Sequence, residues 1–293
     1  MPLNFEPITL DKQDAYLDHF SKCTQKTSEY SFINLWGWAD EYDLRWAWSG
    51  NLVWIQQNIP EILYWAPVGP WADVDWNGCF DEYFAGRTLF NRIPENLLQL
   101  WQDRLSRRFI VEESRGHWDY LYSVKELIEL KGKSFHKKKN LLNQFRKKYD
   151  YEYILFETEM IHKAMEMQED WCTWRDCEAF ESLSAENRAI SKTLHNWNDL
   201  TGIIGGALMV DNKMAAYTVS ESLAEDTLVI HFEKGNPDFK GVYQAINQMF
   251  LEHAGHNFDR VNREQDLEDE GLRKAKLSYN PIGYIKKYGV VLT

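Results

Sequence analysis

A polar stretch near the C-terminal end holds side chains of the types that catalyse group transfer. Residues 260 to 288 read RVNREQDLEDEGLRKAKLSYNPIGYIKKY. The candidates within it are Asn262, Arg263, Glu264, Asp266, Arg273, Lys276 and Tyr279. The carboxylates have the chemistry of a general base, the cations can offset charge on an anionic donor or an oxyanion, and the tyrosine hydroxyl can act as an acid. A polar surface loop held together by ion pairs is the alternative interpretation.

A strongly basic segment is the second candidate. From Lys131 to Lys148 there are eight Lys or Arg residues and His136, with no Asp or Glu. At helical spacing, one apolar side would comprise Phe135, Leu142, Phe145 and Tyr149. A separate polar stripe would comprise Lys133, Lys137, Asn140, Gln144 and Lys148. Because like charges on one helix repel, we expect an anion here: the acceptor end of a tRNA, a phospholipid headgroup or a nucleotide. A solvated helix face is the alternative.

A third candidate is the predicted strand from Leu228 to Glu233. Alternation places His231 and Glu233 on one face of it, where they could transfer a proton or form a structural hydrogen-bonded pair. The expected catalytic residues are thus Lys276, Glu264, Asp266 and Tyr279. The expected substrate- or anion-binding residues are Lys133, Lys137, Asn140, Arg263, Arg273, Asn262 and His231. We expect the basic helix and the polar loop to line one cleft.

The composition bounds the class of protein. The net charge of −12 argues against DNA as a partner, because an acidic surface repels a phosphate backbone. The N-terminus does not resemble a signal peptide, and no apolar run has the roughly 20 residues that cross a bilayer, so a cytoplasmic protein is expected. Four cysteines without a C-x-x-C pair predict reduced thiols, with no metal site. Thirteen tryptophans indicate core packing more than a ligand platform.

The length of 293 residues predicts two domains, which we place at 1–125 and 126–293, with the basic helix 131–148 in the second. In the first, strands are expected at 44–48, 52–56, 62–66 and 109–113, with a helix at 94–107. In the second, helices are expected at 159–178, 185–197, 240–253 and 271–277. Its strands are expected at 203–210, 215–220, 227–233, 258–262 and 284–291. This order is that of a GNAT acyltransferase, and the first half repeats it loosely. The expected fold is therefore α/β with mixed sheets in two tandem GNAT-like domains.

The stretch GNPDFKGVYQAINQ occupies the position of the coenzyme A pyrophosphate loop of such enzymes. That loop normally offers backbone N–H groups from two glycines beside a Gln or Arg, at the start of a helix. Here only Gly241 remains, followed by Val242 and Tyr243. Coenzyme A is therefore disfavoured as a cofactor, although a coenzyme A-dependent N-acetyltransferase stays open as an alternative.

Four motifs together resemble one bacterial family. These are YSFINLWGW, LKGKSFHKKKNLLNQF, GVYQAINQMF and VNREQDLEDEGLRKAKLSYNP, and the resemblance extends over about residues 5 to 290. The family is that of the phosphatidylglycerol lysyltransferase C-terminal domain, which is GNAT-like and distantly related to Fem-type aminoacyltransferases. The resemblance implies transfer of an aminoacyl group from aminoacyl-tRNA to a lipid, peptide or small-molecule acceptor.

The resemblance also singles out one lysine. Fem-type enzymes carry a lysine in an F-K-x-x-F-like stretch, and Ala275-Lys276-Leu277-Ser278-Tyr279 lies where that stretch should be, with Ala in place of the first aromatic residue. Lys276 is therefore expected to stabilise an oxyanion or a phosphate. A non-catalytic module that holds a phosphate-bearing ligand in the same basic groove is the rival from another class.

Overall fold

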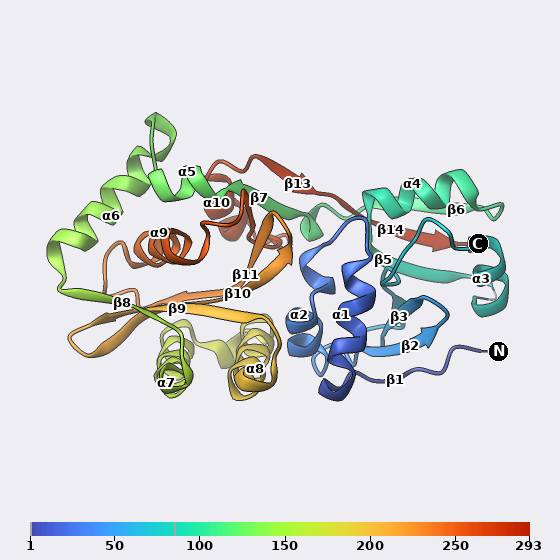
Figure 1. Cartoon of the computed structure of the whole chain (residues 1–293), viewed down its shortest axis with the longest axis horizontal. Helices are drawn as coiled ribbons and strands as arrows, with labels where there is room; N and C mark the ends of the chain where they lie inside the picture. The colour runs from blue at the N-terminus through green and yellow to red at the C-terminus, as the bar shows by residue number, and fades with distance from the viewer. Residues whose placement is uncertain (1, 85) are drawn as a thin grey trace. The chain divides into compact units, whose positions relative to one another are not determined.

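The computed structural model describes residues 2–84 and 86–293, and the chain divides into two compact units (Figure 1). The first unit runs to Asp119 and also takes in Gln265–Asp269 and Tyr284–Thr293. The second unit comprises Tyr120–Glu264 and Glu270–Gly283. This division differs from the expected boundary after residue 125, because two later segments return to the first unit.

The first unit is built on a seven-stranded sheet. Its strands, in spatial order, are β1 (Glu6–Pro7), β2 (Arg45–Ser49), β3 (Leu52–Gln57), β4 (Leu63–Tyr64), β5 (Thr88–Pro94), β14 (Lys287–Leu292) and β6 (Phe109–Glu113). Its helices are α1 (Gln13–Ser21), α2 (Phe32–Trp38), α3 (Trp76–Tyr83) and α4 (Glu95–Arg104). The strands predicted at 44–48, 52–56 and 109–113 are confirmed to within a residue.

Aromatic residues on alternate faces of this sheet explain its two helical layers. Trp46 pairs in register with Ile55, and Trp54 with Ala47, so the two indoles point to opposite faces. Trp46 meets Tyr16 of α1 and Phe32 of α2, and its ring is fully buried. On the other face, Trp54 meets Trp76 and Phe80 of α3, which pack with Trp101 of α4. Trp46 and Trp54 are thus core residues, as their spacing in the strands predicted.

The second unit also has a seven-stranded sheet. Its order is β13 (Gly283–Ile285), β7 (Asp119–Ser123), β12 (Arg260–Asn262), β11 (Thr227–Gly235), β10 (Lys213–Ala224), β9 (Ile203–Val210) and β8 (Tyr151–Leu155). Its helices are α5 (Val124–Glu129), α6 (His136–Lys148), α7 (Thr158–Arg175), α8 (Glu181–His195), α9 (Val242–Ala254) and α10 (Glu270–Leu277). Helix α9 lies on one face of β9–β11, and α7 and α8 lie on the other (Figure 1).

Two expectations about local structure were wrong. The strand expected at 284–291 is two strands separated at Lys286: β13 pairs with β7, and β14 pairs with β5 and β6. The reduced thiols expected at Cys172 and Cys177 instead form a disulfide. Helix α7 ends at Arg175, and Asp176 takes a left-handed conformation that turns the chain back. An uninterrupted helix would have separated the two side chains by about 140°.

Candidate functional site

The candidate site lies where strand β12 leaves strand β11. The two strands are parallel and pair from Thr227/Arg260 to Val229/Asn262. Strand β11 continues to Gly235, so His231 and Glu233 lie beyond the last pair with β12. Arg263 and Glu264 follow β12 at this point and bond to them. Ligand sites commonly form where neighbouring strands of an open sheet diverge beyond the carboxyl ends of parallel strands.

His231 is held between two carboxylates. Its Nδ1 lies 2.8 Å from Glu264 Oε1, and its Nε2 lies 2.9 Å from Glu221 Oε1 on β10. Burial alone would lower the pKa of His231, but the hydrogen bonds and charges of both carboxylates outweigh it and raise this pKa to about 9. The imidazolium therefore donates to both glutamates at neutral pH. The Glu264 side chain remains 19% exposed, whereas the imidazole is fully buried.

Glu233 organises the neighbouring cation. Its Oε1 accepts a hydrogen bond from the Arg263 guanidinium at 2.9 Å, and its Oε2 accepts one from Asn247 of α9 at 3.0 Å. Burial opposes the charge of Arg263, yet attraction to Glu233 leaves the pKa of the guanidinium above its usual value. Arg263 is thus a permanent cation. His231 and Glu233 do not pair with each other, but both contact the loop that follows β12.

The Tyr279 ring contacts two cations. Its ring is 6% exposed, and its hydroxyl accepts a hydrogen bond from Gln244 of α9 at 3.1 Å. Arg263 Cζ lies 4.8 Å from the ring centroid, and Lys138 Nζ of α6 lies 3.9 Å from it. Burial raises the pKa of the Tyr279 hydroxyl, although the neighbouring Arg263 lowers it in part. The hydroxyl therefore keeps its proton at neutral pH.

Lys276 lies on α10 and reaches back to the loop after β12. Its ammonium donates a hydrogen bond to the backbone carbonyl of Arg263, directly before Glu264. The Tyr122 hydroxyl donates to the backbone carbonyl of Lys276 at 2.9 Å. Arg273 lies one turn earlier on the same helix and is partly exposed. The structure therefore places the Lys276 ammonium at the Arg263 backbone carbonyl and 5.8 Å from the centroid of the Tyr120 ring.

Two of the expected loop residues have other surroundings. Asn262 is fully buried, and its Oδ1 accepts a hydrogen bond from the Glu264 backbone N–H at 2.8 Å, which shapes the turn that presents Glu264. Asp266 belongs to the first unit, where its fully buried carboxylate binds Arg115 at 3.2 Å and accepts from the Glu268 N–H at 3.0 Å. Asp266 thus does not join Glu264 as an alternative base.

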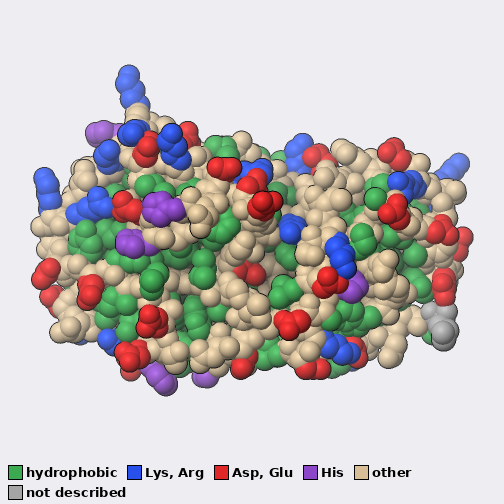
Figure 2. Space-filling model, viewed as in Figure 1, with side chains coloured by type: hydrophobic (Ala, Val, Ile, Leu, Met, Phe, Trp, Pro, Cys, Tyr) green, Lys and Arg blue, Asp and Glu red, His purple; other side chains and the backbone are tan. Residues whose placement is uncertain are grey.

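Helix α6 has the two sides that its periodicity predicted. In α6 and in the 3₁₀ turn Lys133–Phe135 that precedes it, Phe135, Leu142 and Phe145 are buried, and Lys133, Lys137 and Asn140 are exposed. Figure 2 shows Lys and Arg side chains gathered over this helix. Lys138, which was not among the expected residues, is the cation that reaches Tyr279. Its position four residues before Leu142 and seven before Phe145 is the periodic signal that identifies it as an inward residue.

The loop before α9 uses its backbone N–H groups internally. The N–H groups of Asp238 and Phe239 bond to Asn236, that of Lys240 bonds to the Tyr149 hydroxyl, and that of Val242 bonds to the Phe239 carbonyl. These are the groups that would otherwise cradle a pyrophosphate. Gly241 has a positive φ of 87°, and a Cβ there would lie 2.3 Å from the Leu141 carbonyl oxygen. Close packing against α6 thus accounts for this glycine without a ligand.

The described ranges 2–84 and 86–293 contain no group of three or more His, Cys, Asp and Glu side chains arranged to hold a metal. In the triad of Glu221, His231 and Glu264, both ring nitrogens are already directed at the carboxylates.

A second buried charged cluster, which the sequence did not reveal, belongs to the first unit. Lys287 at the start of β14 is fully buried, with its ammonium bonded to Glu29 and, at 2.6 Å, to Asp119. Burial raises the pKa of Glu29, although attraction to Lys287 opposes this. Gln265 donates to Asp119 at 2.6 Å. Arg92 lies 4.0 Å from the other Glu29 oxygen, so the opposite charges of this cluster offset one another away from solvent.

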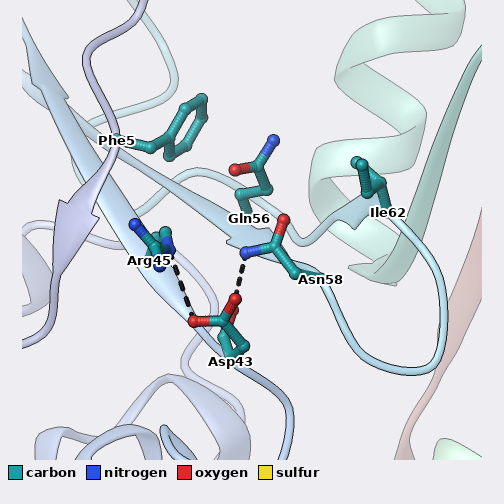
Figure 3. A pocket seen from close by; sticks show the side chains of 6 residues that line it. All are labelled: Phe5, Asp43, Arg45, Gln56, Asn58 and Ile62. Carbon is teal, nitrogen blue, oxygen red and sulfur yellow. Dashed lines mark hydrogen bonds and ion pairs between the residues drawn. The ribbon is translucent and has the colours of Figure 1, made fainter.

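A cavity of about 450 Å³ also opens on the first unit (Figure 3). Its lining residues are Phe5, Asp43, Arg45, Gln56, Asn58 and Ile62. Arg45 forms an ion pair with Asp43 at 3.3 Å, and Asn58 donates to the Asp43 carbonyl at 2.9 Å. None of the residues expected from the sequence lines this cavity. The charges of Arg45 and Asp43 within it already offset each other.

Comparison with known proteins matches this chain to a protein family. The family model described as "Phosphatidylglycerol lysyltransferase, C-terminal" matches residues 20–291. An uncharacterized protein of Mycoplasmoides gallisepticum is 30% identical over 186 residues, or 61% of this chain. The matching region spans 57% of that relative's length. In the described part of the chain, no helix combines the length and apolarity needed to cross a membrane.

Solved structures share the fold. A conserved protein of unknown function from Bacteroides thetaiotaomicron has a TM-score of 0.90 and 30% identity, covering 99% of this chain and all of the other. The C-terminal domain of a putative lysylphosphatidylglycerol synthetase from Agrobacterium fabrum has a TM-score of 0.67 and 13% identity, covering 97% and 92%. FemX has a TM-score of 0.60 and 9% identity, covering 98% and 97%. The predicted α/β fold of two GNAT-like domains with mixed sheets is confirmed.

Proposed function

The chain belongs to the phosphatidylglycerol lysyltransferase C-terminal family. We therefore propose that it transfers an aminoacyl group from an aminoacyl-tRNA to a hydroxyl or amine. The acceptor is a lipid, a peptide or a small molecule, and the reaction takes place in the cytoplasm. The observation that carries the proposal is the triad of Glu221, His231 and Glu264, whose outer carboxylate is accessible where β12 leaves β11.

In the proposed reaction, Glu264 takes the proton of the acceptor as the acceptor lone pair attacks the ester carbonyl carbon. The ester C–O bond then breaks, and the departing ribose oxygen takes up a proton. The protonated hydroxyl of Tyr279 is the proposed donor of that proton. Lys276, with Arg273 one turn away, offsets the negative charge on the carbonyl oxygen in the transition state. Lys276 is suited to this role because it is held beside Arg263 and Glu264.

The charge of the triad supports Glu264 as the base. Two carboxylates share one imidazolium, so the group carries one net negative charge in a largely buried place. Uptake of one proton from the acceptor makes the triad neutral overall. His231 also fixes the direction of the Glu264 carboxylate. It acts as a positioning residue, since it is buried behind that carboxylate.

The experiment that tests the proposal is a transfer assay with purified protein and a mixture of charged tRNAs. Acceptors are offered as amines, peptides and anionic lipid vesicles, and release of deacylated tRNA is measured with the product. Wild-type protein should transfer to one class of acceptor, and Glu264→Gln should not. If wild-type protein binds charged tRNA tightly and transfers nothing to any acceptor, the rival function as a non-catalytic binding module replaces this one.

The exposed basic side of α6 is the observation that favours the rival. Lys133, Lys137 and Asn140 lie on it, and such a surface can hold an anionic ligand without any chemistry. Titration with uncharged tRNA, charged tRNA, vesicles and coenzyme A separates the possibilities. A coenzyme A-dependent acetyltransferase would be stabilised by acetyl-coenzyme A through ligand linkage. We expect a flat thermal-shift response to it, because the N–H groups of the loop before α9 are engaged.

A further inference from the structure

Lys138 differs from the other cations of α6 in its surroundings. Lys137 and Lys139 beside it are exposed, whereas Lys138 is partly buried, with its ammonium 3.9 Å from the centroid of the Tyr279 ring. Lys138 shares its stripe of the helix with Leu142 and Phe145, which are both buried in the core of the second unit. The position of Lys138 on this stripe therefore directs a charged end toward the site instead of toward solvent.

A second cation converges on the same ring. The Arg263 guanidinium lies 4.8 Å from the ring centroid, and its side chain is 15% exposed. The ring cannot easily move away, because its hydroxyl is bonded to Gln244 and the side chain is 6% exposed. One aromatic ring thus contacts an ammonium and a guanidinium that come from segments 125 residues apart in the sequence.

In the described part of the chain, the ion pairs of these two cations involve a single carboxylate, that of Glu233. Glu233 binds Arg263 with one oxygen and Asn247 with the other. Within the part of the chain that the structure describes, Lys138 has no ion pair with a carboxylate. Burial, and then repulsion by Arg263, lower the pKa of Lys138. An unbalanced positive charge at a partly desolvated point is unfavourable, and an anion that contacts both cations would remove the imbalance.

We propose that Lys138 and Arg263 form a subsite for a phosphate group of the substrate, with the Tyr279 ring as its floor. Phosphate fits because its several oxygens can bridge a lysine ammonium and the free N–H groups of an arginine fork at once. Partial exposure of both side chains leaves the position open to a ligand. The inference rests on the proposed function, because it takes the ligand to be the phosphate-bearing substrate of that same site. Binding of phosphate to the subsite does not itself require aminoacyl transfer.

The test measures binding of inorganic phosphate to the full chain, without an acyl donor, at constant ionic strength set with chloride. Saturable binding is followed by calorimetry for the wild type and for Lys138→Gln, Lys138→Arg and Lys139→Gln. Lys138→Gln should weaken binding about tenfold, which is the loss expected for one charge-assisted hydrogen bond. Lys138→Arg should retain most of the binding because it keeps the charge. Lys139→Gln removes the same charge from an exposed neighbour and should change binding less than twofold.

The subsite would be overturned by an absence of saturable binding to the wild type, by equal binding to Lys138→Gln, or by an equal loss in Lys139→Gln. The last would mean that diffuse charge on α6 attracts the anion. Competition by a dinucleoside monophosphate or by glycerophosphoglycerol identifies which phosphodiester the subsite accepts, and failure of both to compete also contradicts it. Phosphate binding without aminoacyl transfer would refute the proposed function but support the subsite. Aminoacyl transfer without phosphate binding would support the proposed function but refute the subsite.

Discussion

His231 and Glu264 are 33 residues apart in the sequence, yet the His231 Nδ1 atom lies 2.8 Å from Glu264 Oε1. The parallel pairing of β12 with the first half of β11 produces this contact. It leaves the second half of β11 beside the loop that follows β12. Predictions about the site therefore begin with these two residues.

Replacing Glu264 by Gln should lower the rate of aminoacyl transfer by about 10²–10⁴-fold, the usual contribution of a general base. The amide keeps the size of the side chain but cannot accept the acceptor's proton. Steady-state transfer measured at saturating donor checks this. The matched control is Glu270→Gln, since Glu270 is an exposed residue at the start of α10. Equal rates for the wild type and Glu264→Gln would remove Glu264 from the mechanism.

His231 should make the stability of the protein depend on pH. Its pKa is raised from 6.5 to about 9 in the folded protein, so the folded state binds the proton more tightly than the unfolded state. The stabilisation is full below pH 6.5 and is lost as the pH rises through 9, a change of roughly 3 kcal/mol. Urea unfolding at a series of pH values should show this decline in the wild type.

In His231→Gln the decline between pH 6.5 and pH 9 should largely disappear. The exposed His256 provides the control, because His256→Gln should leave the wild-type profile unchanged. A profile for His231→Gln that is parallel to that of the wild type would show that the imidazolium is not what the two carboxylates stabilise.

Lys276→Ala should reduce transfer by about 10²–10³-fold, as expected when one donor to an oxyanion is lost. The melting temperature should change little, because the side chain is partly exposed. Lys274→Ala is the control on the same helix, since its side chain is 81% exposed. Full activity of Lys276→Ala would refute the assignment.

Lys287→Met should destabilise the protein by about 3–5 kcal/mol, because it leaves Asp119 buried without its cation and Glu29 facing Arg92 at 4.0 Å. The adjacent Lys286 is 43% exposed and pairs with Glu95 at 3.5 Å. Lys286→Met should therefore cost less than about 1 kcal/mol. Chemical denaturation of both variants measures the difference. Similar losses in the two would mean that the buried cluster does not depend on Lys287.

Gly241→Ala should destabilise the protein by roughly 3 kcal/mol, through its left-handed backbone and the contact with the Leu141 carbonyl. Gly132 separates these effects, because its φ of 88° is similar but nothing lies within 4 Å of a Cβ built on it. Gly132→Ala should cost about 1 kcal/mol from the backbone alone. If the two variants lose the same stability, close packing of α6 on the loop before α9 is not the reason for Gly241.

Much of the secondary structure follows from local patterns in the sequence. The bounds of β6 and β9 agree with the prediction, because alternation and flanking turns are properties of neighbouring residues. The two sides of α6 follow from helical periodicity in the same way. The polar loop after β12 was found because its residue types are those of acid, base and electrostatic chemistry.

The composition of the site could not be found this way. Glu221 joins His231 only through the pairing of β10 with β11, and Lys138 reaches Tyr279 only because α6 packs with its inner stripe toward the core of the second unit. Asp266, two residues after Glu264, belongs to the first unit and binds Arg115 there. Adjacent residues can thus serve different networks.

The sequence by itself determined which side chains are available and which local elements carry them, since these depend on residue type and short-range spacing. The tertiary structure decided the partners: the two carboxylates of His231, the cations over Tyr279, the disulfide of Cys172 and Cys177, and the place of β14 between β5 and β6. Such partners depend on strand register, on where a helix ends and on packing between distant segments, which short-range spacing does not encode.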